Sequence, residues 1–503
     1  MTTHRIGWIA LAVTLLATTP HAQTFAAERF SVAQATSNDA SNDEDWRRRQ
    51  KRPDRPSRTD RGNILIFAPV ILDALPDREI APPEQFERPE ARPRQTAKTR
   101  TSKPKSARQA VAKPRIAKAK SAAPKSRASI PAALAGTYVE GEVLFVAPSP
   151  ELSDRALRRH RLTRLETTDL ALTGTTIVRA RVAKGRNALT TLRELRADKT
   201  LLSSELNHLY ALQADSAGAT SGDLASVQYA PAKMRLPEAH GVADGNTILV
   251  AVIDSGIDGS HPELAGTLDP ASSTTTIGPH GTAIAGVIAA HQRLISASPK
   301  VRILAFDAFL GQQGSAARSS TLDILKSLDK AATAGARIVN LSFAGPEDRL
   351  LSSGLEAAGK RGMILIAAAG NDGPKAAPAY PAAHPAVIAV TATDPTDQIY
   401  ADANRGAYIA LAAPGVDILT TAPDANYSQF SGTSFAAAQV TGVAALLLER
   451  APKLSPDRVR AILTETARDL GKPGRDDVFG AGLVDAAAAL TAVSEATASA
   501  ALQ

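Results

Sequence analysis

Short apolar runs alternate with helical patterns from residue 247 onward. The first run, 248–253, is continuously apolar, as is typical of a strand buried on both faces. Further apolar runs lie at 301–306, 338–341, 363–367 and 387–390. Helical patterns lie near or between them, at 280–291, 322–334, 350–361 and 434–450. This alternation predicts an α/β domain over 229–490, a parallel sheet covered by helices on both faces.

A different pattern precedes this domain, in residues 131–213. Strand-like patterns lie at 142–146, 162–168, 176–182 and 201–210, and helical patterns at 152–160 and 188–196. Their order, β-α-β-β-α-β, predicts a small ferredoxin-like α+β unit. Residues 214–228, rich in Gly, Ser, Ala and Thr, are predicted to be a flexible connector open to proteolysis. Residues 491–503 are predicted to be a flexible tail.

The N-terminus has the pattern of an export signal. His4 and Arg5 precede an apolar run at 6–17, which is short for a membrane span of about 20 residues. We predict a signal peptide over 1–22, with a retained anchor or a buried segment as alternatives. No other run reaches spanning length without interruption, so we expect no further membrane segment. The expected location is the periplasm, the cell surface or the medium.

Charge is concentrated in the segment 23–130, which is rich in Pro, Arg, Lys, Ser and Ala. The chain has 58 basic and 50 acidic residues, but 91–128 alone holds 13 Lys/Arg and no acid. The remaining 45 basic residues face 50 acids, so the folded part is slightly acidic, which disfavours a nucleic-acid-binding groove. We predict a disordered, solvated linker, with binding of an anionic surface polymer or nucleic acid through 91–128 as the alternative. The chain has no cysteine, which excludes disulfides, thiolate metal sites and a cysteine nucleophile.

Three polar residues stand at the ends of predicted elements. Asp254 follows the first apolar run, His280 begins a helical pattern, and Ser434 opens the last long one. Singly, each fits an ordinary role: an Asx turn, a turn histidine or a helix cap. Together they have the order Asp, His, Ser, and no histidine follows Ser434. The α/β-hydrolase and chymotrypsin orders are thereby excluded, and the subtilisin order remains.

The blocks around these residues resemble those of the subtilisin-like serine proteases. The blocks are 252–264, 280–286, 340–346, 368–373, 432–437 and 480–485. The resemblance covers about 229–490 and implies a serine endopeptidase that forms an acyl-enzyme on protein or peptide substrates. Residues 131–213, ending in a strand at 205–210, resemble the inhibitory propeptide of this family. The chain is therefore expected to be a self-processing zymogen whose propeptide is its intramolecular inhibitor.

The resemblance also implies residue roles. His280 would take the proton of Ser434, and Asp254 would orient the imidazole. The Asn371 amide and the backbone N–H of Ser434 would bind the oxyanion. An extended substrate would pair in β-fashion with a strand made of Ser342, Phe343, Ala344 and Gly345.

Some positions depart from the family pattern. Ala283 replaces a second histidine, and Ala438 replaces a proline. Ala344 and Ala379 add methyl groups near the primary pocket, which favours small side chains before the cleaved bond. The segment 291–299, where many relatives bind calcium, has no acidic or Asn ligand, and Ca²⁺ needs 6–8 oxygens. Asp258 and Glu263 are lone candidate ligands, so we expect no metal site and no cofactor.

Two other functions stay open from the sequence. One is a catalytically silent envelope protein that binds anionic polymers through its basic segment. The complete set of triad residues and Asn371 argues against it, because an inert copy would need none of them. The other is esterase or peptide-ligase chemistry on the same acyl-enzyme.

Overall fold

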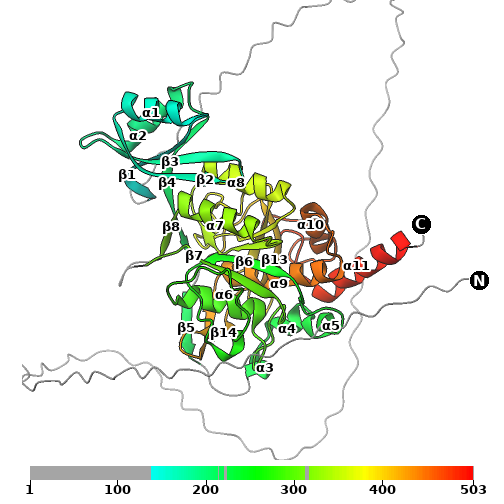
Figure 1. Cartoon of the computed structure of the whole chain (residues 1–503). Coiled ribbons are helices and arrows are strands. Elements are labelled where there is room, and N and C mark those ends of the chain that lie inside the picture. The colour runs from blue at the N-terminus through cyan, green and yellow to red at the C-terminus, as the bar shows by residue number, and fades with distance from the viewer. Residues whose placement is uncertain (1–136, 213–214, 220–223, 312–316, 502–503) are drawn as a thin grey trace, which may run out of the picture. The chain divides into compact units, whose positions relative to one another are not determined.

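The computed structural model describes residues 137–212, 215–219, 224–311 and 317–501 (Figure 1). The expected signal peptide and the basic segment 23–130 lie outside these residues. Among the described residues, no helix is both long and apolar enough to cross a membrane.

The first described unit has the predicted order of elements. It consists of β1 (Tyr138–Val146), α1 (Pro150–Arg159), β2 (Leu162–Leu170), β3 (Thr175–Val182), α2 (Ala188–Ala197) and β4 (Ser203–Leu212). The strands are antiparallel in the order β4-β1-β3-β2, so the ferredoxin-like prediction is confirmed. Ser149 and Asn187 cap the two helices. Alternate strand residues such as Val143 and Phe145 pack against Leu192 and Leu195 of α2.

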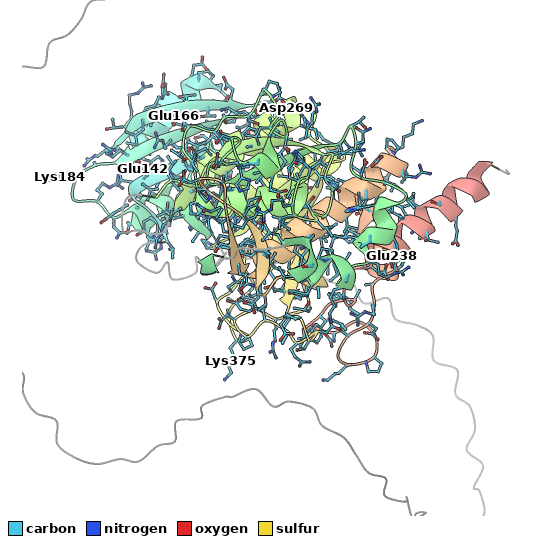
Figure 2. The ribbon with its side chains drawn as sticks, turned by 90° about the horizontal axis from the view of Figure 1, so that it is seen from below. Glu142, Glu166, Lys184, Glu238, Asp269 and Lys375 are labelled. Carbon is cyan, nitrogen blue, oxygen red and sulfur yellow. The ribbon has the colours of Figure 1, made fainter. Side chains whose placement is uncertain are left out.

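Charged side chains cover much of this α+β unit. Figure 2 shows Glu142 and Glu166 on its strands and Lys184 at the loop before α2. Glu142 is buried and accepts a hydrogen bond from the Asn207 side chain at 3.1 Å. Arg179 lies 3.6 Å from Glu142 and 3.1 Å from Glu166.

A central sheet of six parallel strands forms the second unit. Its strands are β6 (Leu249–Asp254), β7 (Arg302–Asp307), β9 (Ile338–Leu341), β11 (Ile364–Ala368), β12 (Val387–Thr393) and β13 (Ile409–Pro414). They lie in the order β13-β12-β11-β9-β6-β7. The expectation missed β13, whose Ala-rich sequence resembles neither a strand nor a helix strongly.

Helices cover both faces of the sheet, as predicted. Along β6, Val250 and Val252 belong to the core that contains α6 (Pro279–Ala289) and α9 (Thr433–Arg450). Ala251 and Ile253 face the core of α7 (Thr321–Thr333) and α8 (Arg349–Lys360). This alternation is the period of two along a strand buried on both sides. The smaller helices are α4 (Ala230–Lys233), α5 (Leu236–His240), a 3₁₀ turn (Pro262–Leu264) and α10 (Pro456–Glu465).

The strand β4 belongs to both units. It extends beyond the α+β unit and pairs antiparallel with β8 (Arg318–Ser320) and β10 (Phe343–Ala344) of the second unit. Ala211 is the partner of Ala344 on one side and of Arg318 on the other.

Two segments contain regular structure that the sequence pattern did not predict. The expected flexible connector contains β5 (Asp215–Ala219) and α3 (Leu224–Val227). The strand forms because it pairs with β15 (Asn426–Ser431), which itself pairs with β14 (Ile418–Ala422). The helix α11 (Ala486–Ala501) extends into the expected flexible tail, 491–503. It does so because Ala489, Leu490 and Val493 pack into the core.

Candidate active site

Asp254, His280 and Ser434 each lie at the end of a strand or the start of a helix. Asp254 ends β6, His280 lies in the first turn of α6, and Ser434 lies in the first turn of α9. The start of α6 sits close to β6 because the Gly281 N–H donates to Ser255 Oγ at 2.9 Å. A Cβ on Gly281 would lie 2.3 Å from the Ser255 carbonyl oxygen, so this approach requires glycine.

The Asp254 carboxylate orients the His280 ring. Asp254 is fully buried, and its Oδ1 lies 2.7 Å from His280 Nδ1 and accepts the Ser255 N–H at 2.7 Å. A proton on Nδ1 in this bond makes Nε2 the acceptor of the ring. His280 Nε2 is buried and has no hydrogen-bond partner in the described part of the chain.

The Ser434 hydroxyl points toward a backbone carbonyl. It donates to the Ser342 oxygen at 3.1 Å, while the Ser342 hydroxyl donates to the Ser434 carbonyl at 3.2 Å. Phe435 stands beside the histidine, with ring centroids 5.8 Å apart. The structure therefore joins Asp254 to His280 directly, and it places Ser434 beside Ser342 and next to the residue whose ring contacts His280.

Asn371 follows β11 and lies against the start of α9. Its Oδ1 accepts the Thr433 N–H at 3.1 Å and the Thr433 hydroxyl at 2.8 Å. These two bonds fix the amide plane next to the nucleophile and turn the amide nitrogen away from Thr433. That geometry suits a donor to a developing oxyanion.

The predicted substrate strand is divided between two partners. Phe343 and Ala344 form β10 and pair with Leu212 and Ala211 of β4. Gly345 instead exchanges two backbone hydrogen bonds with Tyr380, at 2.8 and 3.0 Å. Sequence reasoning missed the second flanking strand, β8, because three residues are too few to show a period.

Comparison with known proteins agrees with this geometry. Residues 245–482 match the family Peptidase_S8, described as the subtilase family. Thermitase from Thermoactinomyces vulgaris is 33% identical over 261 residues, which are 50% of this chain and 91% of thermitase. Subtilisin BL from Lederbergia lenta is 34% identical over 274 residues, 52% of this chain and 98% of the relative.

The chain belongs to the subtilase family. It is a subtilisin-like serine endopeptidase, a peptide hydrolase. In fold it is similar to fervidolysin from Fervidobacterium pennivorans, described as a keratinolytic enzyme related to subtilisin. That match has a TM-score of 0.64 and 23% identity, and covers 71% of this chain and 62% of fervidolysin.

In this subtilase, Tyr210 of β4 packs against the predicted substrate strand. Tyr210 is fully buried, its ring meets Phe343 edge-on at 5.9 Å, and its hydroxyl donates to the Pro346 carbonyl at 3.2 Å. A Cβ on Gly345 would lie 2.3 Å from the ring, so glycine is required there. Burial raises the pKa of Tyr210 well above its ordinary value. No local sequence pattern predicts this contact, because it joins residues that are far apart in the chain.

Two carboxyl groups lie near this tyrosine. Burial raises the pKa of Asp348, which caps α8, to about 6. Burial, together with the charge of Asp348, also raises the pKa of Glu205 on β4, although Arg196 donates to both Glu205 oxygens at 2.6 and 2.7 Å. The contact between the α+β unit and the second unit therefore contains two carboxyl groups whose pKa values are raised by burial.

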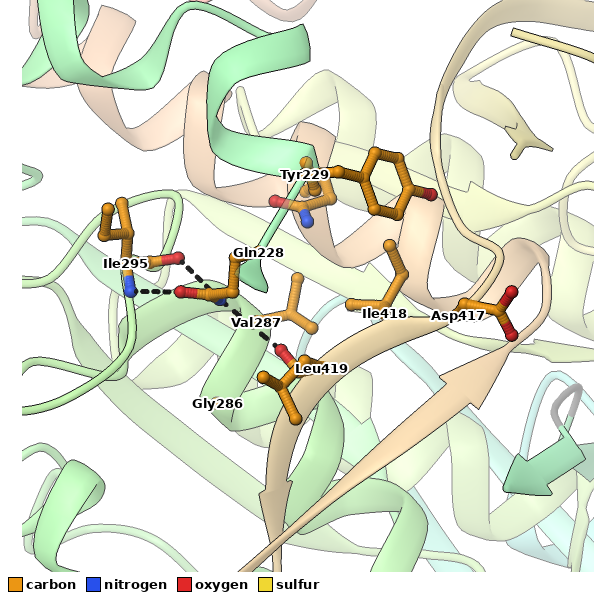
Figure 3. Close-up of a pocket in the computed structure, with 10 residues that line it drawn as sticks. Gln228, Tyr229, Gly286, Val287, Ile295, Asp417, Ile418 and Leu419 are labelled. Carbon is orange, nitrogen blue, oxygen red and sulfur yellow. Dashed lines mark hydrogen bonds between the residues drawn. The ribbon is translucent and has the colours of Figure 1, made fainter. Parts of the chain in front are cut away.

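The segment 291–299 is held by an amide side chain. Figure 3 shows Gln228 beside Ile295 and Leu419. The Gln228 oxygen accepts the Ile295 N–H at 2.8 Å, and its nitrogen donates to the Ile295 and Leu419 carbonyls at 3.2 and 3.4 Å. The adjoining cavity has a volume of about 10 Å³, which is room for about one water molecule.

The two candidate calcium ligands are engaged by hydrogen-bond donors. Glu263 is fully buried and accepts the N–H groups of Gln292 and Arg293 at 2.7 Å each, and the Tyr427 hydroxyl at 2.9 Å. Asp258 accepts from Ser260 and from the Asp424 N–H. The described residues contain no group of three or more His, Asp or Glu placed to hold a metal. At Asp258 and Glu263, hydrogen-bond donors thus occupy carboxylate oxygens that a cation would need.

Proposed function

We propose that Asp254, His280 and Ser434 are the catalytic triad of this endopeptidase. His280 Nε2 takes the proton of Ser434 as Oγ bonds to the carbonyl carbon of the substrate. The Asn371 amide and the Ser434 backbone N–H stabilise the tetrahedral oxyanion. His280 then protonates the leaving amine as the peptide bond breaks, and a water molecule, deprotonated by His280, releases the acyl group. Asp254 stays ionised throughout. The 2.7 Å contact of Asp254 with His280 supports this assignment most directly.

The chain is also its own first substrate. β4 lies between β8 and β10 as an extended substrate would, and it ends at Leu212. β5 begins at Asp215 and pairs with β15, which leads through Gly432 to Ser434. Only two residues separate the two strands, so the cut falls between Leu212 and Asp215. Before and after the cut, β4 occupies the place between β8 and β10 where a substrate would pair. The α+β unit therefore acts as an inhibitor.

The enzyme is exported and works without bound calcium. The N-terminal pattern of a basic pair and a short apolar run supports export to the periplasm, the cell surface or the medium. The Gln228 amide supports the second point, since it supplies the links between 291–299 and its neighbours that a cation would otherwise supply.

Intact mass and N-terminal sequence of the purified wild type and Ser434→Ala test the function. We expect the wild type to begin between residues 213 and 215 and Ser434→Ala to keep its upstream unit. Ser353→Ala, which changes an exposed serine on α8, should process like the wild type. Cleavage of Ser434→Ala at the same bond in the absence of other proteases would contradict the assignment, as would a wild type that hydrolyses no peptide.

A further inference from the structure

An apolar groove lies where the α+β unit meets the second unit. It has a volume of about 360 Å³ and is lined by Val146, Leu172 and Leu202 on one side and by Leu325 and Leu350 on the other. Figure 1 shows the strands of the α+β unit beside α7 and α8, which carry the second side. Leu202 is 65% exposed, so the described residues leave apolar surface uncovered here. Exposed apolar surface that is gathered in one place often marks a binding site.

The charges beside the groove already neutralise each other. Among the described residues that line it, Glu356 and Lys360 are the charged ones, and Lys360 Nζ donates to Glu356 at 2.6 Å. A charged ligand would lose its hydration in the groove without gaining an ionic partner. The groove therefore suits an uncharged, apolar segment.

The chain itself contains a segment of this character. Residues 64–72 carry no charge and form the longest apolar run between the expected signal peptide and β1. They lie outside the described residues, and the 64 residues 73–136 connect them to Thr137. β1 runs from there to Val146 at the groove, a distance of about 26 Å at about 3.3 Å per residue. A chain of 64 residues is long enough to return over that distance.

We propose that residues 64–72 bind in this groove and hold the α+β unit on the second unit. Both units contribute a wall of the groove, so a segment seated in it contacts both and removes apolar surface of each from water. The covalent connection favours this segment over a separate partner, because it keeps the segment at a high effective concentration. The inference rests on the proposed function, since it adds a part to the same inhibitor: residues 64–72 slow the separation of the α+β unit after the cut.

The lack of cysteine in the chain allows a direct test. In the uncut Ser434→Ala precursor, Ala68→Cys places one thiol in the segment, and Ser353→Cys places another at the exposed α8 side of the groove. A disulfide forms only when the two Cα atoms come within about 7 Å. We expect an intramolecular disulfide on mild oxidation, identified by mass spectrometry of a digest. Val242→Cys, an exposed position outside the groove, should replace Ser353→Cys with a yield at least about tenfold lower.

A thiol at position 110 separates binding from simple tethering. Position 110 is closer along the chain to β1 than position 68, and shorter loops close more easily. If the tether alone set the yield, Ala110→Cys would therefore react with Ser353→Cys more than Ala68→Cys does. The proposal predicts the opposite order. Ile66→Asp, which brings a carboxylate to the apolar groove, should lower the yield of the Ala68→Cys pair about tenfold, whereas Ala110→Asp should not.

Two results would overturn the proposal. One is a yield for Ala110→Cys equal to or above that for Ala68→Cys. The other is a disulfide-linked dimer in place of the intramolecular bond, which would assign the groove to a second copy of the chain. The cross-link needs no catalysis, so both results leave the protease assignment intact. A wild type that hydrolyses no peptide would instead overturn the proposed function and leave the cross-link unchanged.

Discussion

Two internal contacts of this subtilase differ in how they are packed. The helix α9 is buried against the central sheet along almost its whole length, through Val440, Val443 and other small apolar side chains. The α+β unit meets α7 and α8 around a groove of about 360 Å³, lined by Leu172 and Leu202 on one side and Leu325 and Leu350 on the other. Close packing, as at α9, is the ordinary state of a protein core.

Apolar packing, strand pairing and polar links all join the α+β unit to the second unit. Leu144 and Ile177 share a buried core with α7 and α8, and β4 pairs with β8 and β10. Lys326 also pairs with Glu166, and the Leu172 N–H donates to Asp329. Exposed ion pairs contribute little to stability. The comparison teaches that the catalytic unit is closely packed around α9, while the contact with the α+β unit leaves a groove beside its shared core.

The largest expected effect on the attachment comes from Tyr210→Ala. Removing this fully buried ring should reduce the free energy of unfolding of the precursor by about 3–5 kcal/mol. Denaturant unfolding in a Ser434→Ala background, which stays uncut, would measure it. Tyr210→Phe keeps the ring and loses the hydroxyl with its bond to Pro346, and it should cost about 1 kcal/mol. Equal shifts for both variants would show that the ring does not anchor the unit.

The next effect is a pH dependence at Asp348. Because its pKa is raised from 3.8 to about 6, its stabilising contribution is complete below about pH 4 and is lost as pH rises through about 6. The loss is about 3 kcal/mol. The raised pKa of Glu205 acts in the same direction, whereas the pKa of His208 is lowered by burial and acts in the opposite one.

Thermal melting of the Ser434→Ala precursor across this pH range would measure the effect. Asp348→Asn, which keeps a side-chain oxygen for the cap of α8, should flatten the profile between pH 4 and 6. A profile unchanged by this substitution would assign the dependence to other groups.

The smallest expected effect is on the free energy of unfolding of the catalytic unit. Gln228→Leu leaves the Ile295 N–H and two carbonyls without their partner and should cost about 2 kcal/mol. Gln292→Leu, an exposed change on the same segment, should cost less than about 0.5 kcal/mol. Calorimetry of the processed enzyme would measure both. Excess chelator should leave the melting temperature of the wild type unchanged. A large fall in the melting temperature would show that the enzyme binds calcium.

The sequence predicted those features that depend on local pattern. The apolar run before Asp254 is a buried strand, and a polar residue at its carboxyl end belongs at the edge where parallel strands present ligands. The α+β unit was predictable for the same reason, since its strands alternate and its helices begin at polar caps.

Long-range pairing was not predictable. β5 has no strand pattern of its own and exists because β15 lies beside it. β15 mixes polar residues with Tyr427 and Phe430, so its period is weak. The packing of Tyr210 and the direction of the Ser434 hydroxyl depend on atoms that only the folded chain brings together.

The short connection between Leu212 and Asp215 has a consequence for reaction order. While the chain is continuous, the segment at the nucleophile is present at the effective concentration of an intramolecular reaction, so the first cut should proceed at a rate independent of protein concentration. Once the connection is cut, the same contact becomes a bimolecular equilibrium governed by a dissociation constant. If the proposed cut occurs, dilution therefore favours separation of the α+β unit from the enzyme.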